Sequence, residues 1–248
     1  MSKLSDRIRN ATRVTPQPLG FVAARTASQA TMVLAALAPD GGAAADLADR
    51  GAEVVIVGSA NAPARPERIE GVEKAVLGAW ISGTDEDEAK RFREAGFDFV
   101  VFDPDRASAT AMLDETIGYV LRLPTELTDI ETRALEGFQL DAIDVGEVGA
   151  PLTVRRQIDL QRLFALTRKP LMSKVSADIS PAELRALRDT NVPVVVVEGR
   201  DAVESLRRKI DELPPRSRRK DEDRPLPFVP RTAAAGGEEE HEHDDDDD

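Results

Sequence analysis

The sequence predicts an α/β protein whose eight strand–helix units close into a single (βα)8 barrel. Short runs rich in valine, isoleucine, leucine and alanine recur from residue 31 to residue 198, at intervals of roughly 20 to 28 residues. Helical patterns with capping residues occupy the intervals, and this alternation is typical of parallel strands joined by helices. Eight units favour a closed barrel over the alternative, an open doubly wound sheet, because open sheets more often stop at five or six strands.

The predicted strands are short apolar runs, several of which stop on a charged residue. Such runs are typical of parallel strands, which are covered on both faces. The chain is 41% hydrophobic and only 4% aromatic, so the core that these strands build is aliphatic. The eight strands are predicted at residues 31–37, 53–58, 76–82, 97–103, 118–122, 143–147, 171–174 and 194–198.

Helix signals are found between the strands. Thr84 is predicted as an N-cap because three acidic residues follow it, where they complement the helix dipole. Thr128 with Glu131, and Ser180 with Glu183, match the capping-box pattern at the start of two further helices. Other helices are predicted at residues 42–50, 108–115, 154–167 and 202–213, the third with a buried stripe of Ile158, Leu160, Leu163 and Leu166.

Three parts of the chain are predicted: an extension over residues 1–30, the barrel over 31–213 and a tail over 214–248. Within the extension, residues 4–13 are expected to form an amphipathic helix with Leu4 and Ile8 on one side. Residues 19–24 are expected to form a short strand that plugs the N-terminal end of the barrel. The tail has blocks of like charge and few apolar residues, so it is predicted to be disordered.

Composition excludes several classes of function. The net charge is -13, and residues 211–248 contribute 14 acidic and 6 basic residues to it, so no basic surface for nucleic acid is expected. No signal peptide opens the chain and no apolar run approaches the length of a membrane span, so we predict a soluble cytoplasmic protein that binds no membrane. The absence of cysteine rules out disulfides and thiolate metal sites.

Motifs for cofactors and for hydrolytic chemistry are missing as well. The sequence contains no Walker loop, no GxGxxG and no GxSxG, so no cofactor is predicted. The two histidines, His241 and His243, both lie in the tail, which argues against a zinc hydrolase.

In its eightfold alternation over residues 31–213, the chain resembles the TIM-barrel superfamily, although the alternation identifies no single family. The fold implies that chemistry takes place at the C-terminal ends of the strands. Four successive strands end there on charges of alternating sign, namely Arg122, Glu147, Lys174 and Glu198. Because neighbouring strands lie about 4.8 Å apart, these four side chains are predicted to form a connected ion-pair ladder.

This ion-pair ladder has two interpretations. In the functional one, Lys174 is the base or the Schiff-base nucleophile, Glu147 or Glu198 moves protons, and Arg122 binds an anionic substrate. Lysine aldolases with this fold usually carry the lysine on strand six or four. Lys174 is on strand seven, which weakens the argument for a Schiff base. In the structural interpretation, the four charges fill the barrel mouth without chemistry.

Further residues are candidates for substrate binding, namely Ser82, Ser176, Gly199 and Arg200. Loops after strands seven and eight often hold a phosphate in barrels of this kind, and Gly199 and Arg200 offer amides and a cation there. Residues 175–180 contain no glycine, so half of the usual cradle is missing, and Arg200 is equally compatible with an ordinary surface position. Asp103 and Asp105 flank a proline and are interpreted as a turn, with a magnesium site as the alternative; no metal is predicted.

The function predicted from these features is a lyase or isomerase that acts on an anionic small molecule at the barrel mouth. The alternative is a barrel without catalytic activity that serves as a binding or scaffold module. In either case, the acidic tail is a candidate contact for a protein partner, or for a second copy of the chain.

Overall fold

A computed structural model describes residues 2–13, 31–83, 85–123 and 127–214 of the chain. Its strands form a closed parallel barrel in which each strand pairs with the next and β8 pairs with β1. The predicted (βα)8 barrel is therefore confirmed, and the open sheet is excluded. The strands are β1 Val33–Ala38, β2 Val54–Val57, β3 Val76–Trp80, β4 Phe99–Phe102, β5 Gly118–Arg122, β6 Ala142–Glu147, β7 Leu171–Lys174 and β8 Val194–Glu198.

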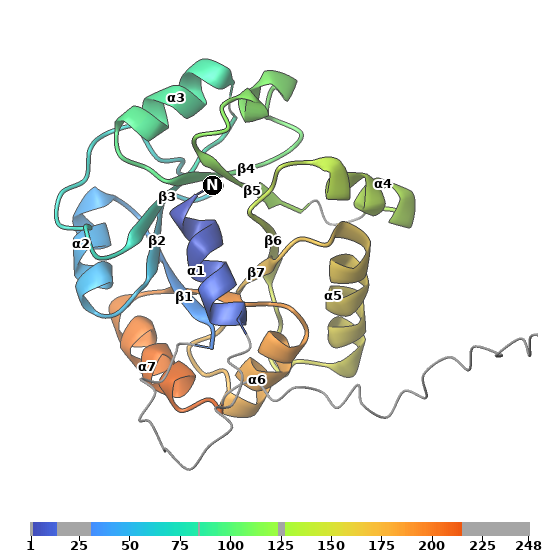
Figure 1. The fold of residues 1–248 in the computed structure, drawn as a ribbon. Helices are drawn as coiled ribbons and strands as arrows, with labels where there is room; N and C mark the ends of the chain where they lie inside the picture. Colours follow the sequence, from blue (N-terminus) through green and yellow to red (C-terminus); the bar gives the residue numbers. More distant parts are fainter. Residues whose placement is uncertain (1, 14–30, 84, 124–126, 215–248) are drawn as a thin grey trace, which may run out of the picture. The chain divides into compact units, whose positions relative to one another are not determined.

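Helices surround the strands, as the ribbon in Figure 1 shows. Both predicted capping boxes are present, at the N-termini of α4 and α6. Position 84 lies outside the described residues, and the side chain of Asp85 caps α3 by accepting from the Glu88 amide. The helices are α1 Lys3–Thr12, α2 Gly41–Asp49, α3 Glu86–Glu94, α4 Asp129–Ala134, α5 Val154–Thr167, α6 Pro181–Asp189 and α7 Arg200–Asp211, with the 3-10 turns η1 Ala109–Leu113 and η2 Leu135–Gly137.

Two connections depart from the regular strand–helix alternation. The segment from Gly58 to Ala75, between β2 and β3, contains only turns and bends. The helix predicted at residues 108–115 is the 3-10 turn η1, which spans only Ala109–Leu113. Both connections belong to the first half of the barrel.

The barrel interior is filled by inward-facing side chains from alternate positions of the strands, because successive residues of a strand point to opposite faces. Gly78 of β3 leaves room for a large neighbour here: a Cβ atom at this position would lie 2.1 Å from Cζ of Phe99. The buried members of this interior cluster on the strands are Val33, Ala35, Val54, Ile56, Val76, Phe99, Val101, Val120, Ala142, Met172, Val194 and Val196.

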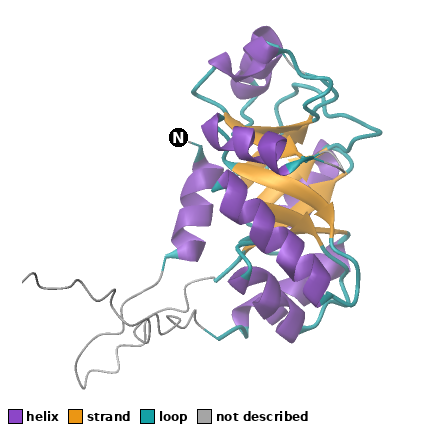
Figure 2. Cartoon of the chain, turned by 90° about the vertical axis from the view of Figure 1, so that its right-hand side faces the viewer, coloured by secondary structure: helices purple, strands orange, loops and turns teal. Residues whose placement is uncertain are grey.

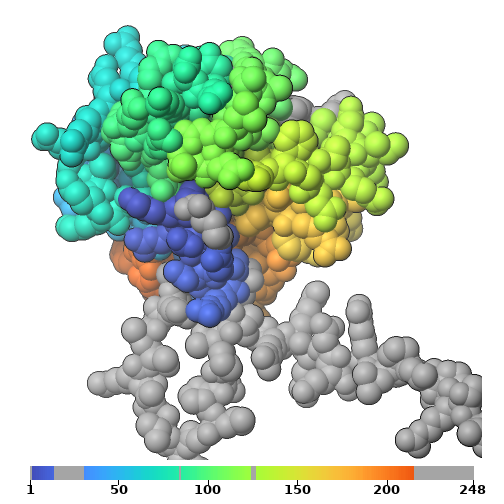
Figure 3. Space-filling view, turned by 45° about the horizontal axis from the view of Figure 1, so that its top comes forward, coloured from blue at the N-terminus to red at the C-terminus, as the bar shows by residue number. Residues whose placement is uncertain are grey.

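Helix α1 closes the N-terminal end of the barrel. Its buried side chains Leu4, Ile8 and Ala11 belong to the interior cluster, so the predicted amphipathic helix is confirmed. Figures 1 and 3 show α1 in dark blue across the centre of this end, and Figure 2 shows it beside the ends of the strands. The strand predicted at residues 19–24 lies outside the described residues.

Two aspartates at the N-terminal end of the barrel hold the start of α1. Asp98, which precedes β4, accepts hydrogen bonds of 3.0 Å from the amides of Lys3 and Leu4. Asp141, which precedes β6, accepts hydrogen bonds of 2.7 Å from the hydroxyls of Ser2 and Ser5. Carboxylates in this position complement the positive end of the helix dipole.

The stripe predicted for α5 is partly wrong. Leu160 and Leu163 are buried, as predicted, but the side chain of Ile158 is 55% exposed. Residues 158 and 160 are two positions apart, which is about 200° around a helix, so they cannot share one face. Thr167, seven positions after Leu160, takes the buried place instead.

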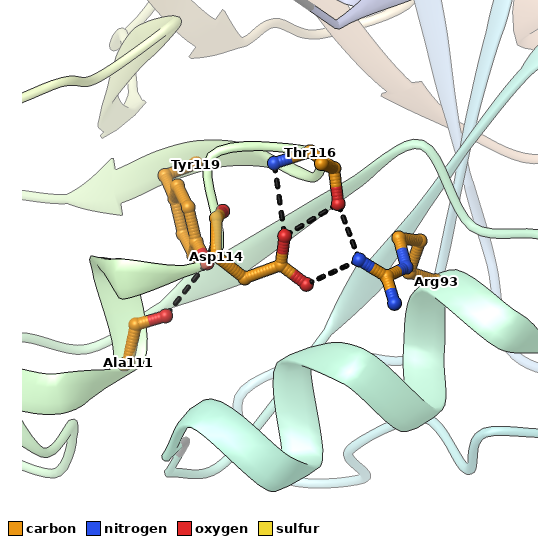
Figure 4. A network of polar contacts seen from close by, with 5 residues as sticks. All are labelled: Arg93, Ala111, Asp114, Thr116 and Tyr119. Carbon is orange, nitrogen blue, oxygen red and sulfur yellow. Dashed lines mark hydrogen bonds and ion pairs between the residues drawn. The ribbon is translucent and has the colours of Figure 1, made fainter.

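A polar network lies in the connection between β4 and β5, which contains no α-helix (Figure 4). Arg93 of α3 forms a 2.8 Å ion pair with Asp114, whose other oxygen accepts a hydrogen bond from the Thr116 amide. The Tyr119 hydroxyl donates to the carbonyl of Ala111 at 2.6 Å and to that of Asp114 at 3.1 Å. Burial raises the pKa of Tyr119 to about 12. The network ties α3 and η1 to the outer face of β5.

Candidate active site

A cavity of about 380 Å³ opens among the residues at the C-terminal ends of the strands, where the fold predicts a site. Its apolar part comes from inward-facing strand residues, and its polar part comes from strand ends and from the loops after β2, β3 and β4. The cavity is lined by Leu37, Ile56, Ser59, Ala60, Asn61, Trp80, Ile81, Ser82, Asp103, Arg106, Arg122, Asp144, Met172, Lys174 and Val196.

Arg122, at the end of β5, is held in place from three sides. One guanidinium nitrogen lies 2.7 Å from a carboxylate oxygen of Asp144. The guanidinium carbon lies 5.8 Å from the ring centroid of Trp80, within the range of a cation–π contact. On the third side is Gly146, where a Cβ atom would lie 2.8 Å from the guanidinium. The ion pair and the cation–π contact therefore orient the guanidinium, and 41% of the Arg122 side chain stays exposed.

Asp144 is the buried carboxylate of this site, with a side chain only 7% exposed. Its second oxygen accepts a 2.9 Å hydrogen bond from the amide of Gly146, whose φ of 73° places it in the left-handed region. Both carboxylate oxygens of Asp144 are thus engaged, as a buried charge requires.

Lys174, at the end of β7, forms the second ion pair of the mouth. Its ammonium lies 3.0 Å from Glu198 of β8, and the two side chains are 35% and 57% exposed. The ammonium group has three N–H donors, so it can donate hydrogen bonds to a ligand as well as to Glu198. Lys174 lines the cavity, whereas Glu198 supports it from outside the lining.

The charges predicted as one continuous ladder are arranged as two separate pairs, Arg122 with Asp144 and Lys174 with Glu198. Glu147 is exposed and is not among the cavity-lining residues. The register between β6 and β7 shifts between Asp144 and Glu147. Sequence reasoning missed Asp144, although a charge inside an otherwise apolar strand signals a buried residue with a partner.

The other predicted binding residues divide into two groups. Ser82 lines the cavity, as Arg122 and Lys174 do. Ser176, Gly199 and Arg200 are outside the cavity lining. Arg200 forms a 2.8 Å ion pair with Asp46 of α2, Gly199 is the N-cap of α7, and the Ser176 hydroxyl accepts from the Asp178 amide.

The Asp103–Asp105 segment forms a turn. The Asp103 side chain accepts a 3.0 Å hydrogen bond from the Asp105 amide, and its carbonyl accepts from the Arg106 and Ala107 amides. Within the described part of the chain, no group of three or more histidine, cysteine, aspartate or glutamate residues is placed to hold a metal ion. The turn also brings Asp103 and Arg106 to the cavity, and sequence reasoning missed the role of Arg106.

Comparison with known proteins shows the fold. No protein-family model and no curated protein matches the sequence. A solved structure of 3-keto-L-gulonate-6-phosphate decarboxylase from Vibrio cholerae matches with a TM-score of 0.55 and 17% identity, over 74% of this chain and 99% of that one. KGPDC from Streptococcus mutans matches with a TM-score of 0.54 and 10% identity, over 73% of this chain and 99% of that one.

An aldolase is also among the similar structures. An HpcH/HpaI aldolase/citrate lyase family protein from Burkholderia cenocepacia matches with a TM-score of 0.54 and 12% identity, over 84% of this chain and 96% of that one. The matches agree with the TIM-barrel fold of the chain. Because all these identities are low, the matches support the fold alone. They leave its activity to be argued from the site.

Among the described residues, none of the helices combines the length and the hydropathy that a membrane span requires.

Proposed function

We propose that the protein is a lyase that cleaves a carbon–carbon bond in an anionic carbonyl compound bound at the barrel mouth. One observation carries the proposal: Arg122 and Lys174 enter the same cavity, and each is held by a carboxylate partner. The floor beneath them is apolar, with Leu37, Ile56, Met172 and Val196 among the lining residues. Two paired cations beside apolar lining residues suit a reaction in which negative charge develops on the substrate.

The two cations have distinct roles in this reaction. When the bond between the α-carbon and its carboxylate or carbinol substituent breaks, the electron pair moves toward the neighbouring carbonyl group and forms an enolate. The substituent leaves as carbon dioxide, or as an aldehyde whose hydroxyl proton passes to water. The ammonium of Lys174 donates a hydrogen bond to the enolate oxygen, which lowers the energy of the developing charge. Lys174 then donates a proton to the α-carbon and regains one from water. Arg122 offers its remaining N–H groups to the carboxylate or carbonyl of the substrate.

The contact with Glu198 is compatible with Lys174 as a hydrogen-bond donor to the substrate. A Schiff base would require the Lys174 nitrogen to leave its 3.0 Å contact with Glu198 and attack the substrate carbonyl. Borohydride treatment in the presence of carbonyl substrates separates the two mechanisms, because it labels Lys174 only if an imine forms.

The comparisons support the class of reaction. The names of the similar structures include a decarboxylase of a keto sugar phosphate and an aldolase/citrate lyase family protein. Both names describe cleavage of carbon–carbon bonds, for which the arrangement of Lys174 and Arg122 is suited. An isomerase that passes through the same enolate is the second candidate, since the same two cations would stabilise it.

Product analysis on a panel of phosphorylated sugars and keto acids tests the proposal. Wild type should split at least one compound into two products, and Lys174→Met should lower that rate by at least about 100-fold. Lys90→Met is the matched control, because Lys90 is an exposed residue of α3, and it should retain full activity. Rearrangement without cleavage would favour the isomerase. Equal rates for wild type and Lys174→Met would overturn the proposed mechanism.

A further inference from the structure

Arg106 differs from the other cations near the mouth. Arg122, Lys174 and Arg200 each form an ion pair with a carboxylate. Within the residues that the structure describes, Arg106 has no such partner, although its exposed side chain lines the cavity. Its five N–H donors are therefore available to a ligand, and their planar arrangement matches the oxygens of a phosphate.

The backbone at Arg106 is held by a hydrogen bond and by a neighbouring loop. Its amide donates a 3.1 Å hydrogen bond to the carbonyl of Asp103, which closes the turn after β4. The loop after β3 lies directly against this turn: a Cβ atom at Gly83 would lie 2.9 Å from the Arg106 carbonyl oxygen. Ser82, which precedes this glycine, lines the cavity as well, so a hydroxyl and a guanidinium come from adjoining loops.

Arg106 lies across the mouth from the proposed reaction centre. It follows β4, whereas Lys174 ends β7, and three strand steps separate these two strands in the eight-stranded barrel. Ser59, Asn61 and Ser82 line the cavity from the loops after β2 and β3. These three side chains supply two hydroxyls and an amide, which are groups that bind substrate hydroxyls.

We infer that Arg106 binds the phosphate of a hydroxylated carbonyl substrate, whose carbonyl group lies at Lys174. This inference rests on the proposed function and names its substrate class, a phosphorylated polyhydroxy compound that extends across the mouth. Phosphate thus binds after β4, whereas the sequence led us to expect it in the loops after β7 and β8. Ser176, Gly199 and Arg200 of those loops are outside the cavity lining, and Arg200 is already paired with Asp46.

One acidic residue also faces this part of the cavity. Asp103 lines it, and one of its carboxylate oxygens accepts a hydrogen bond from the Asp105 amide. Its other oxygen can accept a hydrogen bond from a substrate hydroxyl.

Calorimetric titration with inorganic phosphate tests the inference without any need for turnover. Wild type should bind phosphate, and Arg106→Met should weaken binding by at least about tenfold, as expected for loss of a charged hydrogen-bond donor. Arg106→Lys should retain part of the affinity because it keeps the charge. The matched control is Arg133→Met, an exposed arginine of α4, which should bind as wild type does.

Three outcomes would overturn the inference: no phosphate binding by wild type, equal binding by Arg106→Met, or loss of binding in Arg200→Met instead. Once a phosphorylated substrate is found, Arg106→Met should raise its KM by about tenfold or more with little change in kcat. Failure of the proposed lyase activity would look different. Phosphate binding would then still depend on Arg106, while Lys174→Met would leave turnover unchanged.

Discussion

The two halves of the barrel mouth present different chemistry. Strands β5 to β8 carry charged side chains at their C-terminal ends, and these form the pairs Arg122–Asp144 and Lys174–Glu198. Strands β1 to β4 contribute neutral side chains such as Leu37, Ile56 and Trp80, and their polar cavity groups come from the loops beyond them. Groups on strands are held more rigidly than groups on loops, so the second half suits chemistry and the first half suits recognition.

The connections between strands follow the same division. In the second half, helices α4, α5, α6 and α7 accompany β5 to β8. In the first half, β2 and β3 are joined without a helix, and β4 and β5 are joined through the 3-10 turn η1. Irregular connections of this kind allow the loops of the first half to form the cavity wall.

Asp144→Ala should have the largest effect. The substitution leaves Arg122 without its carboxylate and frees the guanidinium from its position, so activity should fall by about 100-fold or more. Stability should fall by about 1–3 kcal/mol, because Arg122 is partly exposed and water compensates for part of the loss. Urea denaturation measures the second effect.

The matched control for Asp144→Ala is Asp159→Ala, which removes an exposed ion pair with Arg155 on α5. Exposed pairs contribute about 0–1 kcal/mol, so this variant should be nearly as stable and as active as wild type. Equal losses of activity and stability in the two variants would contradict a role of the Arg122–Asp144 pair in the active site.

Gly146→Ala should be the next most damaging change. Residue 146 has a φ of 73°, and a Cβ atom there would lie 2.8 Å from the guanidinium of Arg122. The backbone strain alone should cost about 1–3 kcal/mol, and displacement of Arg122 should lower activity as well. Gly137→Ala is the control, since a Cβ atom there meets nothing within 4 Å. A Gly146→Ala variant with wild-type activity would show that Arg122 does not need its observed position.

Only part of this structure could be predicted from the sequence. Strands and helices were predictable because apolar runs and capping residues are local signals, as the capping box from Thr128 to Glu131 shows. Arg122, Lys174 and Ser82 were predictable because they end strands or follow them directly. Asp144 was missed, and Glu147 was chosen in its place, because the last residue of the strand was taken as the site residue. Alternation along β6 places residue 144 on the inward face with Ala142 and residue 147 on the opposite face.

Arg106 was missed for a different reason. It follows the Asp103–Asp105 turn, and its nearness to the cavity depends on the contact between that turn and the loop at Gly83. Contacts between loops that are far apart in sequence leave no periodic signal. The irregular first half of the mouth was therefore harder to predict than the regular second half.

Tyr119 provides a prediction outside the mouth. It is the only tyrosine of the chain, and burial raises its pKa to about 12. The unfolded chain has a tyrosine pKa of about 10. Stabilisation by the neutral buried phenol is therefore complete below pH of about 10 and is lost as the pH rises toward 12. Ultraviolet absorbance should show the native phenol titrating near 12.

Tyr119→Phe is the companion variant for this region. It should lower stability at neutral pH by about 1–2 kcal/mol, because the buried carbonyl of Ala111 and the partly buried carbonyl of Asp114 lose the hydroxyl that they share. Activity should remain that of wild type, because Tyr119 is not among the cavity-lining residues. A native titration near pH 10 would contradict the burial of this hydroxyl.

Ser82→Ala should have the smallest effect. In the proposed substrate complex, this hydroxyl makes one neutral hydrogen bond, so its loss should raise KM by about three- to tenfold and leave kcat unchanged. Steady-state kinetics on a hydroxylated substrate checks this split. A fall in kcat instead would mean that the first half of the mouth takes part in the chemical step.

The most direct test of the functional role of the charged half measures ligand binding, turnover and melting temperature of Lys174→Met. The only tryptophan, Trp80, lines the cavity, so its fluorescence reports binding of the substrate that wild type turns over. We predict weakened binding or abolished turnover, with a melting temperature within about 4 °C of wild type, because active-site charges often contribute little to stability. A large drop in melting temperature with unchanged binding and turnover would show that the charges are structural and would contradict the proposed active site.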